Sequence, residues 1–437
     1  MEKTIYALSS GSVPSGVAVV RVSGPATRDI LKSLVGSVPP PRQAALRTIR
    51  DRNRQVIDRG LVLFFAAPAS FTGADCAEFQ VHGGKAVVSR LLAVLEEFPE
   101  TRAAEAGEFT RMALSNGKLD LLEVEGLSDL LVAETEMQRR LALEQAQGHL
   151  TSMYDSWARR LTHARAMIEA ELDFADEDDV PGSVSSTVWV DMEHLCQEIR
   201  HHLDGARVGE IIRNGLKVVL IGEPNAGKSS LLNHLAGRDV AIVTPVPGTT
   251  RDILSVDLDI GGFAVTVLDT AGMRETGDEI EQEGIRRARA AARDADVVLH
   301  LSPMDGSAQP GEIPEARRII RVGTKADLAA DAASGGHDLC ISVKTGSGIE
   351  ALLDHLVKDL STMSEAFSLA IPSRIRHVSL LRETLEAIEL ALATPDSHLD
   401  LRAEYLRVAG VSLGRITGHV DTEGLLDIIF SSFCIGK

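Results

Sequence analysis

The pattern of hydrophobic and polar positions changes twice along the chain. In residues 1–117, short apolar runs at 18–22 and 60–65 are typical of strands, and the stretch 86–97 has a helical pattern. The three prolines at 39–41 predict a surface loop. This mixture predicts an α+β domain over residues 1–117.

From residue 119 onward the pattern becomes that of long helices. Apolar side chains recur at spacings of three or four, or sums of these, and predict one buried helical stripe: Met137, Leu141, Leu150, Met153, Trp157, Leu161, Ala164, Ile168 and Leu172. The acidic run 173–179 predicts a solvated loop at the end of this helix, with a contact to a partner as the alternative. Pro181 and Gly182 then break the chain before another expected helix at 188–209.

Residues 213–367 alternate between strand and helix patterns. Strands are expected at 217–221, 264–268, 297–301 and 319–322, and helices at 229–235, 283–292 and 349–360. Such alternation predicts a mostly parallel sheet with helices on both faces. Beyond Pro372 the pattern is helical again, at 380–392 and 399–413. We therefore expect a helical domain in two parts, 118–212 and 368–437, with the α/β domain 213–367 inserted between them.

Composition adds three constraints. A chain of 437 residues is expected to hold about three domains. Its four cysteines are widely separated and form no C-x-x-C pair, which suggests neither a disulfide framework nor a structural zinc site. No basic-then-apolar leader opens the chain and no apolar run approaches the roughly 18 residues of a membrane span, so we expect a soluble, cytoplasmic protein without a membrane partner.

The net charge of −18 argues against a protein that simply coats nucleic acid. The charge is unevenly distributed, because residues 1–117 carry 14 basic and 11 acidic side chains. We expect any polyanion, such as a nucleic acid, to bind a local basic patch in the N-terminal part of the chain.

The chemistry begins at residues 222–229, Gly-Glu-Pro-Asn-Ala-Gly-Lys-Ser, which match the phosphate-binding pattern G-x-x-x-x-G-K-[ST]. An apolar strand pattern precedes this loop and a helix pattern follows it, which favours a phosphate site over a chance match in a glycine-containing loop. Lys228 is suited to the β and γ oxygens of a triphosphate, and Ser229 has the hydroxyl expected on Mg²⁺.

Further nucleotide motifs follow. Asp269-Thr270-Ala271-Gly272 comes after an expected strand, where an Asp supports the Mg²⁺ shell and a Gly lets a backbone N–H reach the γ-phosphate. Thr250, in the preceding Pro- and Gly-punctuated loop, is a candidate second Mg²⁺ ligand. These motifs predict a P-loop, Ras-like GTPase domain, so the expected fold is a multi-domain α/β protein with an N-terminal α+β domain and a discontinuous helical bundle.

Base selection is expected from Thr324-Lys325-Ala326-Asp327, where GTP-binding proteins carry N-K-x-D. Asp327 retains the guanine contact, whereas Thr324 offers one hydroxyl in place of an amide and predicts weaker nucleotide affinity. Ser342, Val343 and Lys344 are expected to back the base. Met273 stands where Ras-type enzymes have the Gln that orients the attacking water, so another residue must position that water.

Two polar clusters occupy turn-like settings in the N-terminal part, and by themselves they fit capping boxes and loop glycines equally well. They comprise Ser70-Phe71-Thr72-Gly73-Ala74-Asp75 with Glu78 and His82-Gly83-Gly84, then Gly107-Glu108-Phe109-Thr110-Arg111 and Asn116-Gly117-Lys118. Together with the nucleotide motifs, Arg21-Val22-Ser23-Gly24-Pro25 and the terminal Cys434-Ile435-Gly436-Lys437, they make the chain resemble the MnmE (TrmE) family of tRNA modification GTPases over nearly its whole length.

This resemblance implies a potassium-activated GTPase that dimerises through its nucleotide domains. K⁺ would be bound by Asn225 and by the loop residues Thr244, Val246 and Thr249 and would take the place of an arginine finger. Glu281 would position the water, with Lys228 and Arg274 as the other catalytic residues. The residues expected around GTP are Asn225, Ala226, Gly227, Lys228, Ser229, Ser230, Thr244, Pro245, Val246, Pro247, Gly248, Thr249, Thr250, Asp269, Thr270, Ala271, Gly272, Thr324, Lys325, Asp327, Ser342, Val343 and Lys344.

One departure concerns the K⁺ loop. Pro245 and Pro247 stand where family members commonly have Asp and Ala, and their fixed φ angles narrow the shapes that the loop can take.

The resemblance also implies a tetrahydrofolate-binding N-terminal domain that takes part in dimerisation and binds 5-formyltetrahydrofolate or another one-carbon derivative through Arg21, Glu78, Lys118 and Lys437. With the flavoprotein MnmG (GidA), which carries the FAD, the chain would add an aminomethyl or carboxymethylaminomethyl group to C5 of the wobble uridine, position 34, of certain tRNAs. A regulatory GTPase that docks on the ribosome or another assembly without modification chemistry is the alternative.

Overall fold

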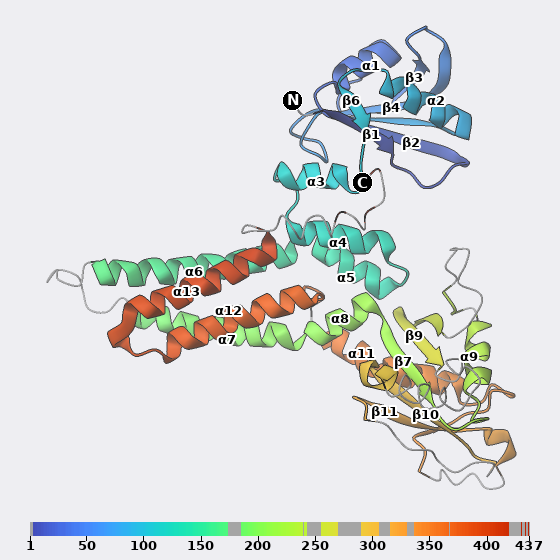
Figure 1. Ribbon diagram of the computed structural model, residues 1–437, viewed down its shortest axis with the longest axis vertical. Coiled ribbons are helices and arrows are strands. Elements are labelled where there is room, and N and C mark those ends of the chain that lie inside the picture. The colour runs from blue at the N-terminus through green and yellow to red at the C-terminus, as the bar shows by residue number, and fades with distance from the viewer. Residues whose placement is uncertain are drawn as a thin grey trace, which may run out of the picture. The chain divides into compact units, whose positions relative to one another are not determined.

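The computed structural model describes residues 3–173, 185–238, 240–242, 255–269, 290–305, 315–329, 336–366 and 368–418, with the single positions 430, 433 and 436. It forms two compact units (Figure 1). The first contains residues 1–128, 146–158 and 411–437, and the second contains 129–145 and 159–410. No helix within the described ranges is long and apolar enough to cross a membrane.

The first unit contains a six-stranded sheet in the order β3-β4-β5-β2-β1-β6. Its elements are β1 (Thr4–Leu8), β2 (Ser15–Ser23), α1 (Thr27–Val35), β3 (Ala45–Arg50), β4 (Val56–Phe65), β5 (Cys76–Gly83), α2 (Lys85–Glu96), β6 (Thr101–Ala103) and α3 (Glu108–Ser115). All neighbouring strands are antiparallel except β1 and β6. The strands expected at 18–22 and 60–65 lie within β2 and β4, so the α+β prediction is confirmed.

Helices α1 and α2 cover one face of this sheet. Alternate residues of the strands, Val20, Val22, Val62, Phe64 and Phe79, pack there against Ile30, Leu31 and Leu91 of the two helices. The opposite face carries polar and exposed residues. This alternation is typical of an antiparallel sheet with one covered face.

Among the described residues, the helical regions on either side of the inserted domain contain α4 (Leu121–Val132), α5 (Glu136–Ala146), α6 (His149–Asp173), α7 (Ser185–Asp204), α8 (Ala206–Asn214), α12 (Ile375–Ala393) and α13 (Leu399–Thr417). The prediction of one helical stripe from Met137 to Leu172 is wrong in two respects. Gly148, with φ 77°, separates α5 from α6, and the Leu172 side chain is 40% exposed. A left-handed glycine ends a helix that an apolar spacing alone would continue.

The single helix expected at 188–209 is also wrong, because it divides at Gly205 into α7 and α8. A Cβ at Gly205 would lie 2.8 Å from Cγ2 of Ile371, and one at Gly209 would lie 2.5 Å from the carbonyl oxygen of Pro372. The glycines therefore allow the returning segment at 371–372 to pack directly on α8. The acidic run at 173–179 falls almost entirely outside the described residues.

The inserted domain has a sheet in the order β12-β11-β10-β7-β9-β8. Its elements are β7 (Leu216–Ile221), α9 (Lys228–Ala236), β8 (Ser255–Ile260), β9 (Phe263–Asp269), β10 (Val297–Pro303), β11 (Ile319–Thr324), β12 (Leu339–Cys340) and α11 (Ile349–Ala366). Only β8 is antiparallel, paired with β9, so the mostly parallel sheet is confirmed. No strand was expected at the position of β8. The helix expected at 283–292 lies mostly outside the described residues.

The end of the chain packs within the first unit. Phe430 and Phe433 are buried against Leu121 and Val124 of α4. A Cβ at Gly107, whose φ is 68°, would lie 2.8 Å from the Phe430 ring. The Ser9 hydroxyl donates a hydrogen bond to the Gly436 carbonyl at 2.8 Å, so the last residues of the chain contact the first strand-to-strand connection.

Candidate functional site

The phosphate loop joins the end of β7 to the start of α9 and turns through two left-handed residues, Asn225 (φ 66°) and Gly227 (φ 92°). Asn is among the few non-glycine residues that adopt this conformation readily. Gly222 is required for another reason, because a Cβ there would lie 2.3 Å from the Leu301 carbonyl of the neighbouring strand β10. The backbone of the motif is thus fixed by its own sequence.

Lys228 begins α9 and is buried. Its ammonium donates to the carbonyl oxygens of Gly222 at 2.6 Å and Glu223 at 2.9 Å, both in the phosphate loop. The positive charge of Lys228 is therefore held against the phosphate loop, where a bound phosphate would contact both this ammonium and the N-terminus of α9.

Ser229 and Asp269, both expected near Mg²⁺, lie in direct contact. The Ser229 hydroxyl donates to Oδ2 of Asp269 at 2.7 Å, which joins the first turn of α9 to the end of β9. A hydroxyl next to a carboxylate is an oxygen donor set of the kind that Mg²⁺ prefers, since this ion binds one or two protein ligands and otherwise water and phosphate. The pair therefore fits Mg²⁺.

The base-recognition residues lie at the same edge of the sheet. Thr324, at the end of β11, is buried, and its hydroxyl donates to the carbonyl of Ala226 in the phosphate loop at 2.8 Å. The Ser342 hydroxyl donates to the Asp327 carboxylate at 2.7 Å, which orients the predicted acceptor for guanine. Thr324 therefore links the phosphate loop to the base-recognition residues. Unlike the amide of an asparagine, its side chain has a single polar atom with which to make this link.

The sequence analysis missed one residue of this cluster. Asp305, two residues after β10, forms an ion pair with Lys325, whose ammonium donates a hydrogen bond to Oδ2 of Asp305 at 2.7 Å. Lys325 itself is in the left-handed conformation with φ 55°. The signal that could have identified Asp305 is its position just beyond the carboxyl end of a parallel strand, where ligand-binding residues of such sheets gather.

Several predicted site residues lie outside the described residues. They are Thr244, Pro245, Val246, Pro247, Gly248, Thr249, Thr250, Thr270, Ala271, Gly272, Met273, Arg274, Glu281, Cys434 and Lys437. Their roles stay predictions.

A second cluster lies on the uncovered face of the N-terminal sheet. Arg21 of β2 and Glu78 of β5 are paired in register, and the guanidinium donates to the Glu78 carboxylate from Nη2 at 2.9 Å and from Nε at 3.2 Å. The Phe71 and Phe109 rings lie 5.5 and 5.6 Å from the guanidinium carbon of Arg21. A cation, a carboxylate and two aromatic rings thus gather at one place.

Lys118 belongs to the same neighbourhood through the loop that carries Phe71. The Asn116 amide donates to the Thr72 carbonyl at 2.7 Å, and a Cβ at Gly73 would lie 3.3 Å from Cγ of Lys118. Cys76, beside this cluster, is buried, and burial raises the pKa of its thiol to about 12, which disfavours the reactive thiolate. Neither Phe71 nor Phe109 was predicted as a site residue, although both lie within the quoted motifs.

Residues 4–118 match the family described as GTP-binding protein TrmE N-terminus, and residues 121–434 match the MnmE helical domain. The tRNA modification GTPase MnmE of Rhizobium meliloti (strain 1021) is 60% identical over 99% of both chains. The chain belongs to the MnmE (TrmE) family. The predicted resemblance is therefore confirmed, and so is the predicted fold class.

A further relative in the MnmE family has similar coverage. The tRNA modification GTPase MnmE of Brucella canis is 56% identical over 99% of this chain and 98% of that protein. Among solved structures, the G domain of the T. maritima FeoB iron transporter is 24% identical, covers 33% of this chain and 97% of that chain, and has a TM-score of 0.25.

Proposed function

We propose that this chain is the GTP-hydrolysing component of a complex that adds an aminomethyl or carboxymethylaminomethyl group to C5 of the wobble uridine of certain tRNAs in the cytoplasm. As a member of the MnmE family it is a GTPase of tRNA modification. The finer statement, that a tetrahydrofolate derivative supplies the one-carbon unit, depends on the N-terminal cluster.

The observation that carries this proposal is the Arg21–Glu78 pair between Phe71 and Phe109. The Phe71 ring is 38% exposed and offers a surface on which a flat pterin can stack, whereas the buried Phe109 ring packs beside Arg21. The Glu78 carboxylate can accept hydrogen bonds from the N–H groups of a pterin edge. Arginine and lysine bind the carboxylates of a glutamate tail, and Lys118 lies next to the Phe71 loop. The residues present therefore fit a folate, which would supply the one-carbon unit.

The nucleotide site supports GTP hydrolysis by charge stabilisation. Lys228 would exchange the two loop carbonyls that it now contacts for the β and γ oxygens of GTP, and Ser229 with Asp269 would hold Mg²⁺. The exposed Asn225 side chain offers an amide oxygen at the rim of the loop, which fits a K⁺ ion. Glu281 would then orient the water.

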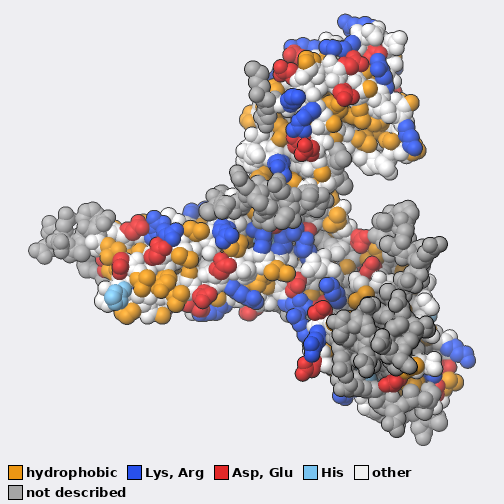
Figure 2. Space-filling model, viewed as in Figure 1, with side chains coloured by type: hydrophobic (Ala, Val, Ile, Leu, Met, Phe, Trp, Pro, Cys, Tyr) orange, Lys and Arg blue, Asp and Glu red, His pale blue; other side chains and the backbone are white. Residues whose placement is uncertain are grey.

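A homodimer is part of the proposal. Large hydrophobic side chains are exposed on the uncovered face of the N-terminal sheet, with Val17 at 59%, Leu46 at 51% and Leu61 at 39% exposure, and Leu46 and Leu61 are cross-strand partners. Hydrophobic side chains also gather on this domain in Figure 2. Exposed apolar patches commonly mark protein contacts. The flavoprotein MnmG, with its FAD, is the proposed second partner.

The alternative is a switch protein that hydrolyses GTP and docks on an assembly without chemistry of its own. Such a protein has no use for the Arg21 cluster. Mass spectrometry of wobble uridines from a strain that lacks the gene separates the two. The proposal requires unmodified uridine, restored by the wild-type chain and not by Arg21→Ala. Normal modification in the deletion strain would refute it.

A further inference from the structure

The inserted nucleotide domain is joined to the helices at two places. Helix α8 leads into β7 through Asn214 and Gly215, and α11 returns to α12 through residues 368–374. Each connection has an arginine at its junction with the helical domain. Arg213 is the next-to-last residue of α8, and Arg374 immediately precedes α12.

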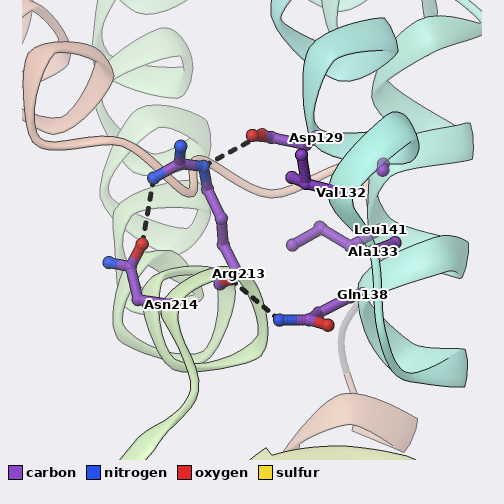
Figure 3. Close-up of a pocket in the computed structure, with 8 residues that line it drawn as sticks. Asp129, Val132, Ala133, Gln138, Leu141, Arg213 and Asn214 are labelled. Atoms are coloured by element: carbon purple, nitrogen blue, oxygen red, sulfur yellow. Dashed lines mark hydrogen bonds and ion pairs between the residues drawn. The ribbon is translucent and has the colours of Figure 1, made fainter. Parts of the chain in front are cut away.

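One carboxylate binds both arginines. Asp129 of α4 accepts from Nε of Arg213 at 2.9 Å, and both of its oxygens accept from Nη2 of Arg374 at 2.9 Å. The three side chains are mostly buried, at 14%, 28% and 19% exposure for Asp129, Arg213 and Arg374. Figure 3 shows Arg213 reaching across to Asp129. We call these three residues the Asp129 joint.

The arrangement depends on the charge of Asp129. Two guanidinium groups that share one carboxylate lie close to each other and repel unless the negative charge separates them. When one partner of a buried ion pair is removed, the remaining charge is left without compensation. An amide in place of the carboxylate would therefore release at least one of the two connections.

Helix α5 adds contacts of the same kind. The Gln138 amide donates to the Arg213 carbonyl at 3.3 Å, and the buried Gln145 amide donates to the Ser373 hydroxyl at 2.9 Å. A cavity of about 90 Å³ lies between Asp129, Val132, Ala133, Gln138, Leu141, Ala142, Arg213 and Asn214 (Figure 3). This cavity is much smaller than the roughly 300 Å³ or more that a drug-sized ligand occupies, so we assign these residues a structural role and no ligand.

A short path leads from this joint to the nucleotide. The Met137 backbone N–H at the start of α5 donates to the Gly262 carbonyl at 3.0 Å, and Met137 and Leu141 belong to the same hydrophobic core as the nucleotide sheet. Gly262 directly precedes β9, which ends at Asp269, the residue bonded to Ser229. A displacement of Asp269 along β9 would thus reach α5.

We infer that Asp129 is a positioning residue that couples the state of the nucleotide site to the helical domain. It holds both connections of the inserted domain against α4. A displacement of Asp269 therefore moves α4 and α5, whereas without Asp129 the inserted domain would rotate about its connections and leave the two helices in place. The inference rests on the proposed function, because the coupled output is tRNA modification. The bonds described for Asp129 are to Arg213 and Arg374, outside the phosphate loop and the Ser229–Asp269 pair, so we assign it no part in hydrolysis itself.

The test compares Asp129→Asn with wild type in the complex of the full chain, its flavoprotein partner and unmodified tRNA. We measure modified uridine formed per GTP hydrolysed. We expect hydrolysis by the isolated chain within about twofold of wild type and a fall in the ratio of about 5- to 150-fold, the range typical of coupling between sites. Glu136→Gln is the matched control, since it removes a carboxylate from an exposed ion pair on α5 and should leave the ratio unchanged.

A second readout does not need the modification reaction. Amide hydrogen exchange of α4 and α5 is compared between the GDP-bound chain and the chain with a GTP analogue. Wild type should show a nucleotide-dependent difference that Asp129→Asn loses. Persistence of that difference, or an unchanged ratio of modification to hydrolysis, would overturn the inference. Absence of modification in wild type would refute the proposed function, and the exchange readout would still test Asp129.

If Asp129→Asn fails to fold, Arg213→Gln replaces it, because Arg213 is the more exposed of the two arginines and its loss removes one of the bonds to Asp129 and one exposed bond to Asn214. We expect a smaller fall in the ratio for this variant. Equal ratios for Arg213→Gln and wild type would likewise overturn the inference.

Discussion

Replacement of Thr324 tests how the two halves of the nucleotide site are held together. Its hydroxyl is buried and donates to the Ala226 carbonyl at 2.8 Å. Thr324→Val keeps the shape of the side chain and removes the donor. Thr324→Asn keeps a donor and adds an amide oxygen, which restores the pattern that GTP-binding proteins commonly carry.

The expected magnitudes follow from the hydrogen bond. Loss of the donor leaves the buried Ala226 carbonyl without this partner, at a cost of about 1–3 kcal/mol, so Thr324→Val should weaken GTP and GDP binding about 5- to 160-fold. One additional hydrogen bond contributes about 0.5–1.5 kcal/mol, so Thr324→Asn should strengthen binding about 2- to 13-fold. The hydrolysis rate at saturating GTP should change little, because Thr324 has no described contact with Lys228, Ser229 or Asp269.

Titration of a fluorescent guanine nucleotide into each variant measures these affinities. Thr266→Val is a suitable control, because the Thr266 hydroxyl binds the exposed carboxylate of Asp257 on the same sheet and lies away from the loop. Equal dissociation constants for wild type and Thr324→Asn would refute the idea that the threonine limits affinity. Unaltered binding by Thr324→Val would show that the Ala226 contact contributes nothing.

Four further outcomes are expected. Glu281→Gln should keep GTP affinity and lose most turnover, and an unchanged kcat would remove its proposed role with the water. GTPase rates should be higher in KCl than in NaCl, and equal rates would rule out potassium activation. Ser342→Ala should weaken guanine nucleotide binding about 2- to 13-fold, because the Asp327 carboxylate loses the hydrogen bond that orients it. The same titration measures this effect, and unchanged binding would show that Ser342 does not orient Asp327. Burial, and then the neighbouring His377 and His201, lower the pKa of His202 from 6.5 to about 4, so stability is full above pH 6.5 and falls by about 3 kcal/mol as the pH drops toward 4. Denaturant unfolding of His202→Gln should lose this slope, whereas the exposed His201→Gln removes only the smallest of the three causes and should retain most of it.

Much of the fold could be predicted from local patterns. The strands β2, β4, β7, β9, β10 and β11 consist of apolar runs whose burial determines their structure, and the phosphate loop was recognised because strand, glycines and helix follow one another in the sequence. The link between Ser229 and Asp269 could also be anticipated, since both motifs lie at the carboxyl edge of one parallel sheet.

What could not be predicted depends on contacts between distant residues. Gly205, where α7 and α8 divide, lies against Ile371, which is 166 positions away in the chain, and the ion pair of Lys325 with Asp305 requires the pairing of β10 with β11. Asp129 is unremarkable in sequence, as one of three acidic residues in α4 beside Glu123 and Glu125. Its importance appears only when α8 and the segment before α12 are brought to the same place.

The packing of the chain end has a consequence for how the protein is made. Phe430 and Phe433 fill the space beside Gly107 and α4, and Gly436 accepts a hydrogen bond from Ser9. During synthesis the N-terminal sheet leaves the ribosome more than 400 residues before these partners do, since Ser9 and Gly436 are 427 positions apart. The surface of the N-terminal sheet beside Ser9 and Gly107 is therefore completed only after Phe430, Phe433 and Gly436 have been synthesised.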